Sequence, residues 1–279
     1  SEQRWLDRHP TVTVGVAENF APLTFFNAEG QFSGLTAQLL TLISQRSGLH
    51  FNVLRGRYID QQTQRLKAGE IDVIPAIIPT TEGEADLHFT RPYLTNPYTL
   101  VSANTPGSPK TLDDLAGKRL AIHHSHPIRA LIQARVPGVR MVDVESPAQG
   151  LELVMKGQAD AALSSLFMTR YLIARYYQGR LRIGSTVGDE PARIAMAMDR
   201  DAPELQSILN KALLSISPEE MDGLVARWSN DVVVDDSSWL RHRPAILQAF
   251  AAAASMLLLA LGWIAWQRRQ IRQRQQWLQ

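Results

Sequence analysis

The chain of 279 residues contains no cysteine. This absence excludes disulfide bonds, thiolate metal sites and cysteine nucleophiles. An export signal is also lacking at the N-terminus, which reads SEQRWLDRHP and has neither an initiator methionine nor an apolar run. We therefore expect either that a signal was removed or that the chain is a piece of a longer protein.

An excess of positive charge is absent from most of the chain. Six arginines and no acid lie after residue 238, so the net charge of +2 for the whole chain becomes −4 for residues 1–238. No basic stretch with interleaved aromatic residues occurs in that region, and nucleic acid is therefore not an expected partner. Anionic lipid is the natural partner of the arginine-rich end.

One long apolar run is present at residues 245–266, which read AILQAFAAAASMLLLALGWIAW and carry no charge. A hydrocarbon core about 30 Å thick needs about 20 apolar helical residues, so this run predicts a transmembrane helix. More arginine follows it than precedes it. The positive-inside rule then places residues 1–244 in the periplasm and residues 267–279 in the cytoplasm of a bacterial inner membrane. A buried core helix is the alternative, but such helices seldom run this long without a polar face.

The apolar run also contains small residues, among them Ala249, Ala253 and Gly262, which allow two helices to pack closely. On this pattern we expect a homodimer in the lipid bilayer. Beyond the run, Ile271 and Leu278 lie seven residues apart, which is the spacing of a heptad. This spacing favours a short helical stub on the cytoplasmic side.

Strands and helices alternate between residues 11 and 232. TVTVGVA (11–17) and IDVIPAII (71–78) are typical of buried strands, and amphipathic segments separate such runs. The alternation predicts an α/β fold with βαβ units.

Two helix-to-strand junctions resemble each other, at 67–72 and at 156–160, which predicts that the same unit is built twice. Extended crossings are expected near 98–104 and 181–198. Two lobes joined by two crossings make a clamshell, and its cleft is the natural ligand site.

Helix caps are expected where Ser, Thr or Asp precedes an amphipathic segment, because the side-chain oxygen accepts a free backbone N–H. The expected capping residues are Ser33, Asp60, Thr111, Ser146, Asp201 and Ser217. A further helix is expected to begin at Ser125–Pro127, with proline near its first position. Residues 80–83 are expected to form a loop.

These patterns divide the chain into segments. The expected segments are an N-terminal connector at 1–10, a first lobe at 11–95 and 195–232, a second lobe at 96–194, a juxtamembrane linker at 233–244, a transmembrane helix at 245–266, and a cytoplasmic helical stub at 267–279.

Several stretches together carry a family resemblance. They are VGVAENFAPLTF, GQFSGLTAQLLTLI, LKAGEIDVIPAIIPTTEG followed by FTRPY, LDDLAGKRLAI, and GQADAAL. In this order, over residues 10–232, the chain resembles the type II periplasmic solute-binding proteins of family 3, the polar amino-acid binders. The resemblance implies a two-lobed α/β Venus-flytrap clamshell, here followed by one transmembrane helix.

Other features narrow the resemblance. WLDRHP before the first strand, the segment IDVIPAIIPTTE, and the apolar run after the second lobe are similar to the membrane-proximal Venus-flytrap domain of a BvgS/EvgS-type sensor histidine kinase. The resemblance implies a periplasmic sensory domain of a two-component system that signals by lobe closure through one membrane helix. A membrane-tethered binding protein that serves a transporter is the alternative, and a receptor half of a cyclic-dinucleotide enzyme is a third.

The resemblance also implies where ligand contacts lie, and two of the family's charged groups are missing here. The family's T-x-E-R loop holds an Arg that grips the ligand α-carboxylate, whereas this chain places Gly83 there. The family's Asp for the α-amino group lies five residues after the GxxD aspartate, and counting from Asp160 gives Ser165. Because the bidentate Arg–carboxylate pair is a large share of such recognition, we expect a small carboxylate rather than a standard amino acid.

Other candidate contacts remain in the expected cleft. Phe20 stands where the family has an aromatic residue that stacks on ligand, although a core position under a loop is an equal alternative. The helix N-terminus at Ser125–Pro127 favours an anion, and its histidines add a charge that depends on pH. The full set of ligand-binding candidates is Phe20, Ala76, Ile77, Thr80, His124, Ser125, His126 and Ser165.

The run His123–His126 also raises a metal site as an interpretation. Adjacent strand residues face opposite ways and no carboxylate lies close in sequence, so we expect no metal. A cleft that responds to pH and plain histidines at the cleft rim both remain open.

No catalytic residue and no cofactor are expected. Asp72 and Asp160 follow a glycine at helix-to-strand turns, which suits a structural hydrogen-bonding role, and Ser164–Ser165 lacks the G-x-S-x-G setting of a nucleophile.

Overall fold

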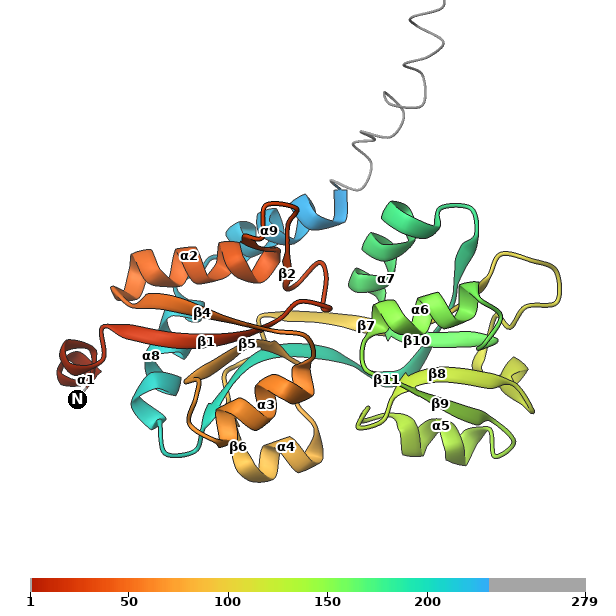
Figure 1. Ribbon diagram of the computed structural model, residues 1–279, viewed down its shortest axis with the longest axis horizontal. Helices are drawn as coiled ribbons and strands as arrows, with labels where there is room; N and C mark the ends of the chain where they lie inside the picture. The colour runs from red at the N-terminus through yellow and green to blue at the C-terminus, as the bar shows by residue number, and fades with distance from the viewer. Residues whose placement is uncertain (1, 231–279) are drawn as a thin grey trace, which may run out of the picture. The chain divides into compact units, whose positions relative to one another are not determined.

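Two α/β lobes make up the described part of the protein, residues 2–230, in this computed structural model (Figure 1). The elements of the first lobe are α1 (Glu2–Arg8), β1 (Thr11–Ala17), β2 (Phe25–Phe26), β3 (Phe32–Ser33), α2 (Leu35–Ser47), β4 (His50–Gly56), α3 (Ile59–Lys67), β5 (Val73–Ile77), α4 (Thr81–Asp86), β6 (Leu87–Phe89), α8 (Pro203–Leu214) and α9 (Pro218–Asn230). Strand β1 pairs in parallel with β4 and β5. Parallel neighbours need a crossover, and α2 and α3 supply it.

The second lobe repeats this arrangement on its own sheet. Its elements are η1 (Leu112–Leu115), β8 (Arg119–His123), α5 (Arg129–Arg135), β9 (Arg140–Val144), α6 (Pro147–Met155), β10 (Ala161–Ser165), α7 (Leu166–Leu172) and the π-helix η2 (Ile173–Tyr177). Strand β8 pairs in parallel with β9 and with β10. Both lobes therefore carry parallel strands covered by helices, as the alternation predicts.

Two strands, β7 (Leu94–Ala103) and β11 (Leu181–Asp199), run between the lobes (Figure 1). They pair with each other in antiparallel fashion, with register shifts near the middle of β11. The overall order is β4-β1-β5-β11-β7-β10-β8-β9, with β6 beside β11. The predicted clamshell with two extended crossings is confirmed, and the second crossing is one continuous strand.

Helix α2 shows how the sequence pattern produces a lobe core. Leu35, Leu39 and Ile43 recur at helical spacing and are fully buried. Gly48 ends the helix at φ 77°, a left-handed conformation that glycine adopts without strain. The expected cap at Ser33 is wrong. Gly34 is the N-cap instead. Only glycine fits at this position, because a Cβ there would lie 2.3 Å from the Leu23 carbonyl oxygen.

The other predicted caps divide into two groups. Thr111, Ser146 and Ser217 precede their helices as expected; for example, the Ser146 hydroxyl accepts from the Gln149 N–H. Asp60 and Asp201 are not caps, since Tyr58 and Ala202 hold those positions. The Asp60 carboxylate makes no cap hydrogen bond and is free to face the other lobe.

The repeated junctions have the same hydrogen-bonding role in both lobes. The Asp72 Oδ2 atom accepts from the Thr13 N–H at 2.7 Å, and the Asp160 Oδ2 atom accepts from the Arg119 N–H at 2.7 Å. Each aspartate ties the start of one buried strand to the start of its neighbour. The expected structural role of Asp72 and Asp160 is therefore observed.

The N-terminal segment is helical and packs on the first lobe. The expected connector contains helix α1, which packs on α8 and is held by an ion pair of 2.8 Å between Glu2 and Lys211. None of the helices within residues 2–230 is long and apolar enough to cross a membrane. The linker, transmembrane helix and stub expected at 233–279 lie outside the described residues.

Candidate functional site

A cavity of about 270 Å³ lies between the two lobes. Its walls come from the ends of β1, β5, β8, β9 and β10 and from the starts of α3, α4 and α7. Ligands of α/β proteins bind outside the carboxyl ends of parallel strands, and both lobes present such ends here. The volume lies close to the lower end of ligand pockets, about 300 Å³, and suits a small molecule.

The structure brings most of the predicted ligand-site residues to this cavity. The residues from the predicted set that line it are Phe20, Ile77, Thr80, His124, Ser125, His126 and Ser165. Ala76 of β5 is not among them, because it is buried in the first-lobe core and is only 2% exposed. Phe20 also packs against the first-lobe core, and its stacking on a ligand stays a prediction.

Thr80 has a structural role as well as a place in the cavity wall. Its hydroxyl caps α4 by accepting from the Gly83 N–H at 3.0 Å, so residues 81–83 begin a helix rather than the expected loop. Gly83 lines the cavity, and a Cβ there would lie 3.1 Å from Thr80 Oγ1 and 3.4 Å from Phe89 Cζ. Phe89 and the cap therefore crowd the place where the family carries its arginine.

Ser165 offers an unused hydroxyl on the opposite wall. The residue is 3% exposed, and its Oγ atom is buried without a hydrogen-bond partner among the described residues. Although Ser165 is the N-cap of α7, its side chain makes no cap hydrogen bond. A buried hydroxyl left unpaired costs free energy, which a polar group of a ligand would offset.

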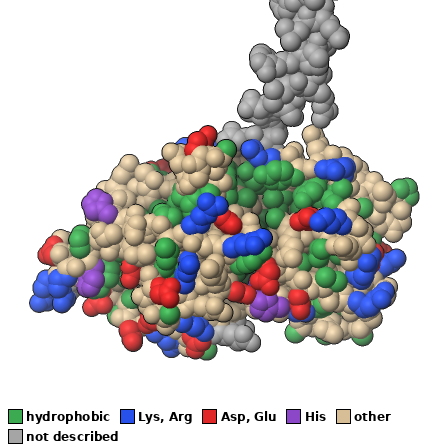
Figure 2. Space-filling model, in the orientation of Figure 1, with side chains coloured by type: hydrophobic (Ala, Val, Ile, Leu, Met, Phe, Trp, Pro, Cys, Tyr) green, Lys and Arg blue, Asp and Glu red, His purple; other side chains and the backbone are tan. Residues whose placement is uncertain are grey.

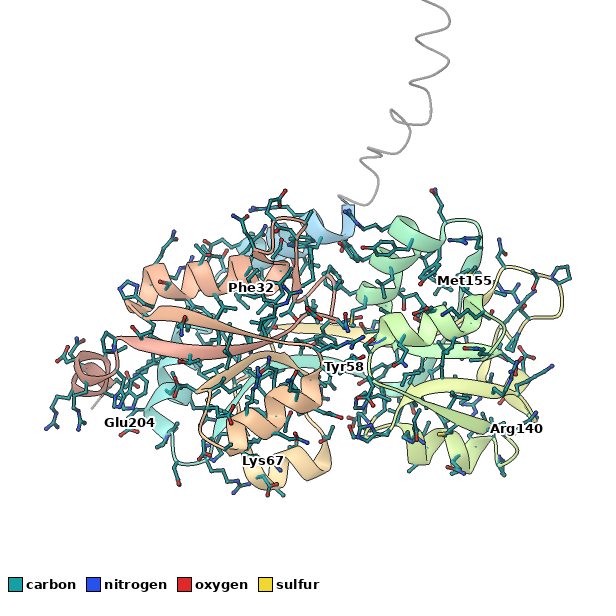
Figure 3. The ribbon with its side chains drawn as sticks, in the orientation of Figure 1. Phe32, Tyr58, Lys67, Arg140, Met155 and Glu204 are labelled. Atoms are coloured by element: carbon teal, nitrogen blue, oxygen red, sulfur yellow. The ribbon has the colours of Figure 1, made fainter. Side chains whose placement is uncertain are left out.

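Some cavity residues escaped the sequence reasoning. Arg57, Tyr58, Asp60 and Lys67 line the first-lobe wall. Tyr58 lies beside the gap between the lobes in Figure 3. The Arg57 guanidinium lies 5.2 Å from the Tyr58 ring centre, and Lys67 forms an ion pair of 2.5 Å with Asp86. Arg57 and Tyr58 directly follow the parallel strand β4. This position after a parallel strand is the sequence signal that could have identified them.

The segment after β8 forms turns rather than the expected helix start. Helix α5 begins at Arg129, so the expected helix is present but its predicted start at Ser125–Pro127 is wrong. The His123 ring is the physical reason, because its Nδ1 atom accepts from the Ser125 N–H at 3.3 Å and lies 3.0 Å from the Ser125 hydroxyl. The His126 N–H then bonds to the His123 carbonyl oxygen at 3.0 Å and closes a turn.

The expected positive charge at this place is not available from His126. Its ring packs against the Tyr98 ring at 4.6 Å between centres. Desolvation lowers the pKa of His126 to about 3, and His123 and Arg129 act in the same direction. His126 is therefore neutral between pH 5 and pH 8. Burial also lowers the pKa of His123, although the carboxylate of Asp60 acts against this.

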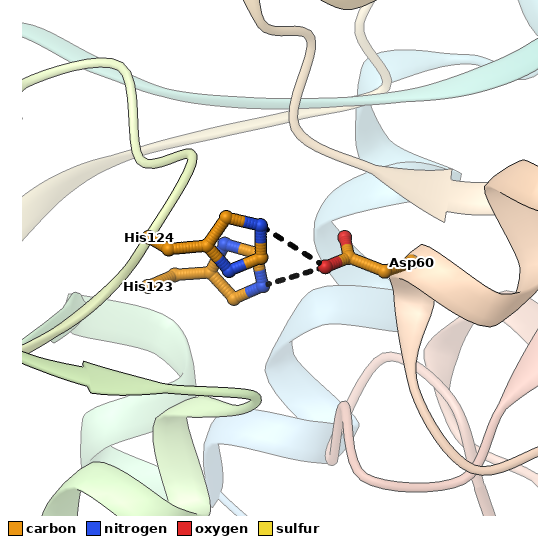
Figure 4. Close-up of side chains that lie close together, drawn as sticks. All are labelled: Asp60, His123 and His124. Carbon is orange, nitrogen blue, oxygen red and sulfur yellow. Dashed lines mark ion pairs between the residues drawn. The ribbon is translucent and has the colours of Figure 1, made fainter.

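His123 and His124 face the same way, contrary to the expectation from strand alternation. Strand β8 ends at His123 and His124 begins the turn, so their rings stack at 4.4 Å between centres. Their Nε2 atoms lie 3.7 Å and 3.4 Å from the Asp60 Oδ2 atom of the first lobe (Figure 4). The carboxylate that the local sequence lacked comes from α3 across the cleft.

Taken together, these groups suit non-covalent binding. The cavity offers aromatic and aliphatic walls, an unpaired hydroxyl on Ser165, and a guanidinium on Arg57 at its edge. Pockets of this kind, mostly apolar with a few convergent polar groups, are typical of small-molecule sites.

Comparisons with known proteins agree with this geometry. Virulence sensor protein BvgS of Bordetella pertussis is 36% identical over 98% of this chain, and sensor protein EvgS of Escherichia coli K12 is 27% identical over 85%. The chain spans 22% and 20% of the length of these relatives. The crystal structure of the B. pertussis BvgS periplasmic domain matches with a TM-score of 0.82 and 35% identity, over 88% of this chain and 48% of that one.

A match to a family model identifies the family. The model of the bacterial extracellular solute-binding proteins, family 3, covers residues 12–231, which is most of the chain and includes both lobes. The chain therefore belongs to the bacterial extracellular solute-binding proteins, family 3.

Proposed function

We propose that this chain is the periplasmic sensory part of a transmembrane two-component sensor histidine kinase. The single observation that carries the proposal is the ligand-sized cavity between two lobes in a chain whose curated relatives are sensor proteins. The state of lobe closure sets the signal. A ligand shifts that state only through its different affinity for the open and closed forms. The runner-up, a tethered carrier that serves a transporter, has less support, because BvgS and EvgS, the relatives at 36% and 27% identity, are sensor proteins.

The path from the lobes toward the membrane begins at α9, the last described helix. Trp228 of α9 lies 5.6 Å from Phe25 of the first lobe and 6.4 Å from Tyr171 of the second, measured between ring centres. Helix α9 therefore contacts both lobes, and Figure 2 shows hydrophobic side chains gathered near the junction of α7 and α9. Opening the cleft changes the contact of Trp228 with Tyr171, which repositions the end of α9.

The ligand class follows from the polar groups of the cavity. With glycine at 83 and serine at 165, these two positions lack the pair of charges that the family resemblance implies for an amino-acid zwitterion. The Ser165 hydroxyl and the Arg57 guanidinium remain as partners for one carboxylate. We therefore favour a small carboxylate as ligand. No cofactor is part of the proposal.

The proposal also assigns the lobe boundaries and the C-terminal residues 233–279. The first lobe comprises residues 11–95 with 195–232, and the second comprises 96–194. Residues 245–266 cross a bacterial inner membrane once, so that residues 1–244 are periplasmic and 267–279 cytoplasmic. The apolar run of small residues supports a homodimer, and anionic lipid is the partner of the flanking arginines.

A chimera tests the proposal. This chain replaces the matching region of B. pertussis BvgS, and a reporter gene records the kinase output. Ser165→Trp fills the cavity and holds the lobes apart, so we expect the output to change to one constant level. His50→Trp, on the exposed outer strand β4, is the control and leaves the output unchanged. Trp228→Ala removes the ring that contacts Tyr171, so it should change the output as well. An output that is the same in S165W, W228A and the parent chimera would overturn the proposal.

A further inference from the structure

Three metal-ligating side chains meet at the mouth of the cleft, one from the first lobe and two from the second. Asp60 lies in the first turn of α3, and His123 and His124 lie at the end of β8 (Figure 4). One ligand atom from each side chain lies within 4.8 Å of the other two. Neither lobe alone contains this group, so it exists only when α3 and the end of β8 face each other.

We propose that Asp60, His123 and His124 bind a divalent transition-metal ion, zinc foremost, that ties the two lobes together. Zinc forms bonds of about 2.0–2.1 Å to histidine nitrogen and carboxylate oxygen in a tetrahedron, which separates neighbouring ligand atoms by about 3.3 Å. The distances from Asp60 Oδ2 to the two Nε2 atoms, 3.4 Å and 3.7 Å, are close to that separation. The two Nε2 atoms lie within 4.8 Å of each other and their rings are stacked, so both rings must turn toward the ion before the three ligand atoms can share one tetrahedron.

The donor set selects the metal. Two imidazoles and one carboxylate suit Zn²⁺ and its transition-metal neighbours, whereas Ca²⁺ and Mg²⁺ take oxygen ligands. Three protein ligands leave a fourth tetrahedral position for water or for a carboxylate of a ligand in the cleft. The site thus adds a cationic contact to a cavity that lacks the arginine of its family.

The surroundings of His123 fit a metal ligand. Its Nε2 atom is buried and has no hydrogen-bond partner within the described part of the chain. Its Nδ1 atom lies 3.0 Å from the Ser125 hydroxyl, which accepts the ring proton when Nε2 binds metal. In the free protein the Ser125 N–H donates to Nδ1 at 3.3 Å and favours the tautomer that carries its proton on Nε2. Metal binding at Nε2 therefore moves the ring proton to Nδ1 and replaces that backbone hydrogen bond by one to the Ser125 hydroxyl.

An ion also has access to the site. The side chains of His124 and Asp60 are 50% and 38% exposed, while that of His123 is 18% exposed. Among the other charged groups nearby, Glu145 adds negative charge, and Arg129 is occupied by an ion pair of 2.8 Å with Asp143. Binding to the closed arrangement only would stabilise that arrangement in proportion to the logarithm of metal excess.

The test uses the full chain of 279 residues, purified in detergent, freed of any affinity tag and treated with a chelator. Titration with ZnCl₂ in a calorimeter gives the stoichiometry, and the absorption of bound Co²⁺ reports the coordination. We expect one ion per chain. Loss of an outer partner of a ligand costs about 10–100-fold in affinity, so Asp60→Asn and His124→Gln, which remove a ligand itself, should each lower it by about 100-fold or more.

Matched controls and the folded state of each variant make the result decisive. Asp222→Asn and His50→Gln change exposed residues of the same types elsewhere and should bind zinc like the parent chain. Thermal unfolding without metal checks that every variant folds. The proposed metal bridge between the lobes would be overturned if the parent chain did not bind zinc, or if D60N bound zinc as tightly as the parent chain. Because the readout is metal binding, its failure leaves the proposed sensory function standing.

Discussion

The two lobes repeat one junction and reinforce it differently. In both, an aspartate after a helix-to-strand glycine accepts from the backbone of the neighbouring strand, at Thr13 in the first lobe and at Arg119 in the second. In the second lobe the Arg119 guanidinium also bonds to the same aspartate, at 3.1 Å and 3.0 Å. Side-chain hydrogen bonds from Arg119 hold the pKa of Asp160 below its usual value. The backbone bond is thus the shared element, and the ion pair is an addition of one lobe.

A second contrast concerns the polar residues at the cleft. On the first-lobe wall the Thr80 hydroxyl is used by a helix cap, whereas on the second-lobe wall the Ser165 hydroxyl is unused. The Thr80 hydroxyl thus stabilises the start of α4. The second wall leaves one hydroxyl without a partner among the described residues.

The largest expected effect tests whether the lobes unfold together. Leu39→Ala in the first lobe and Leu151→Ala in the second each remove a fully buried side chain and should each cost about 2–5 kcal/mol of unfolding free energy. Because β7 and β11 run through both sheets, we expect a single transition in denaturant for either variant, followed by circular dichroism. Two separate transitions, with L39A moving only one, would show that the lobes are independent.

The next effect separates the two junctions. Asp160→Asn removes the charge that pairs with Arg119 and should cost about 1–2 kcal/mol, since hydrogen bonds to charged groups contribute more than neutral ones. Asp72→Asn keeps a neutral acceptor for the Thr13 N–H and loses no ion pair, so its cost should be smaller. Thermal unfolding of both variants beside the parent chain gives the comparison. Equal costs would show that the Arg119 pair adds no stability.

A smaller effect distinguishes the two cleft hydroxyls. Thr80→Ala removes the cap of α4 and should cost about 1 kcal/mol. Ser165→Ala removes a hydroxyl without a partner among the described residues, so its stability should stay near that of the parent chain. In a thermal-shift assay with a panel of small carboxylates, the rise in melting temperature that a ligand causes should disappear in S165A and persist in T80A. The reverse pattern would place ligand recognition on the first wall.

The smallest effect is a dependence on pH. The folded pKa of Asp160 is lowered, so its contribution to stability is present above the unfolded pKa of about 3.9 and is lost as pH falls through the folded value. The difference in melting temperature between the parent chain and D160N should therefore be largest near pH 7 and shrink below about pH 4. A difference that grows on acidification would contradict this sign.

Local patterns in the sequence were sufficient for the architecture. The alternation of strands and amphipathic helices, the two crossings and the caps at Thr111, Ser146 and Ser217 depend on residues close together in the chain. The caps expected at Ser33, Asp60 and Asp201 were wrong, since Gly34, Tyr58 and Ala202 hold the N-cap positions.

The sequence by itself determined the two-lobed α/β fold, the repeated aspartate junctions and part of the cleft wall, because hydrophobic periodicity and strand ends are local properties. Only the tertiary structure decided the use of the cleft residues. The His123 ring folds its own turn, Thr80 serves a helix, and Asp60 reaches two histidines of the other lobe. Contacts between lobes depend on how two separately folded sheets face each other, and no local pattern encodes that orientation.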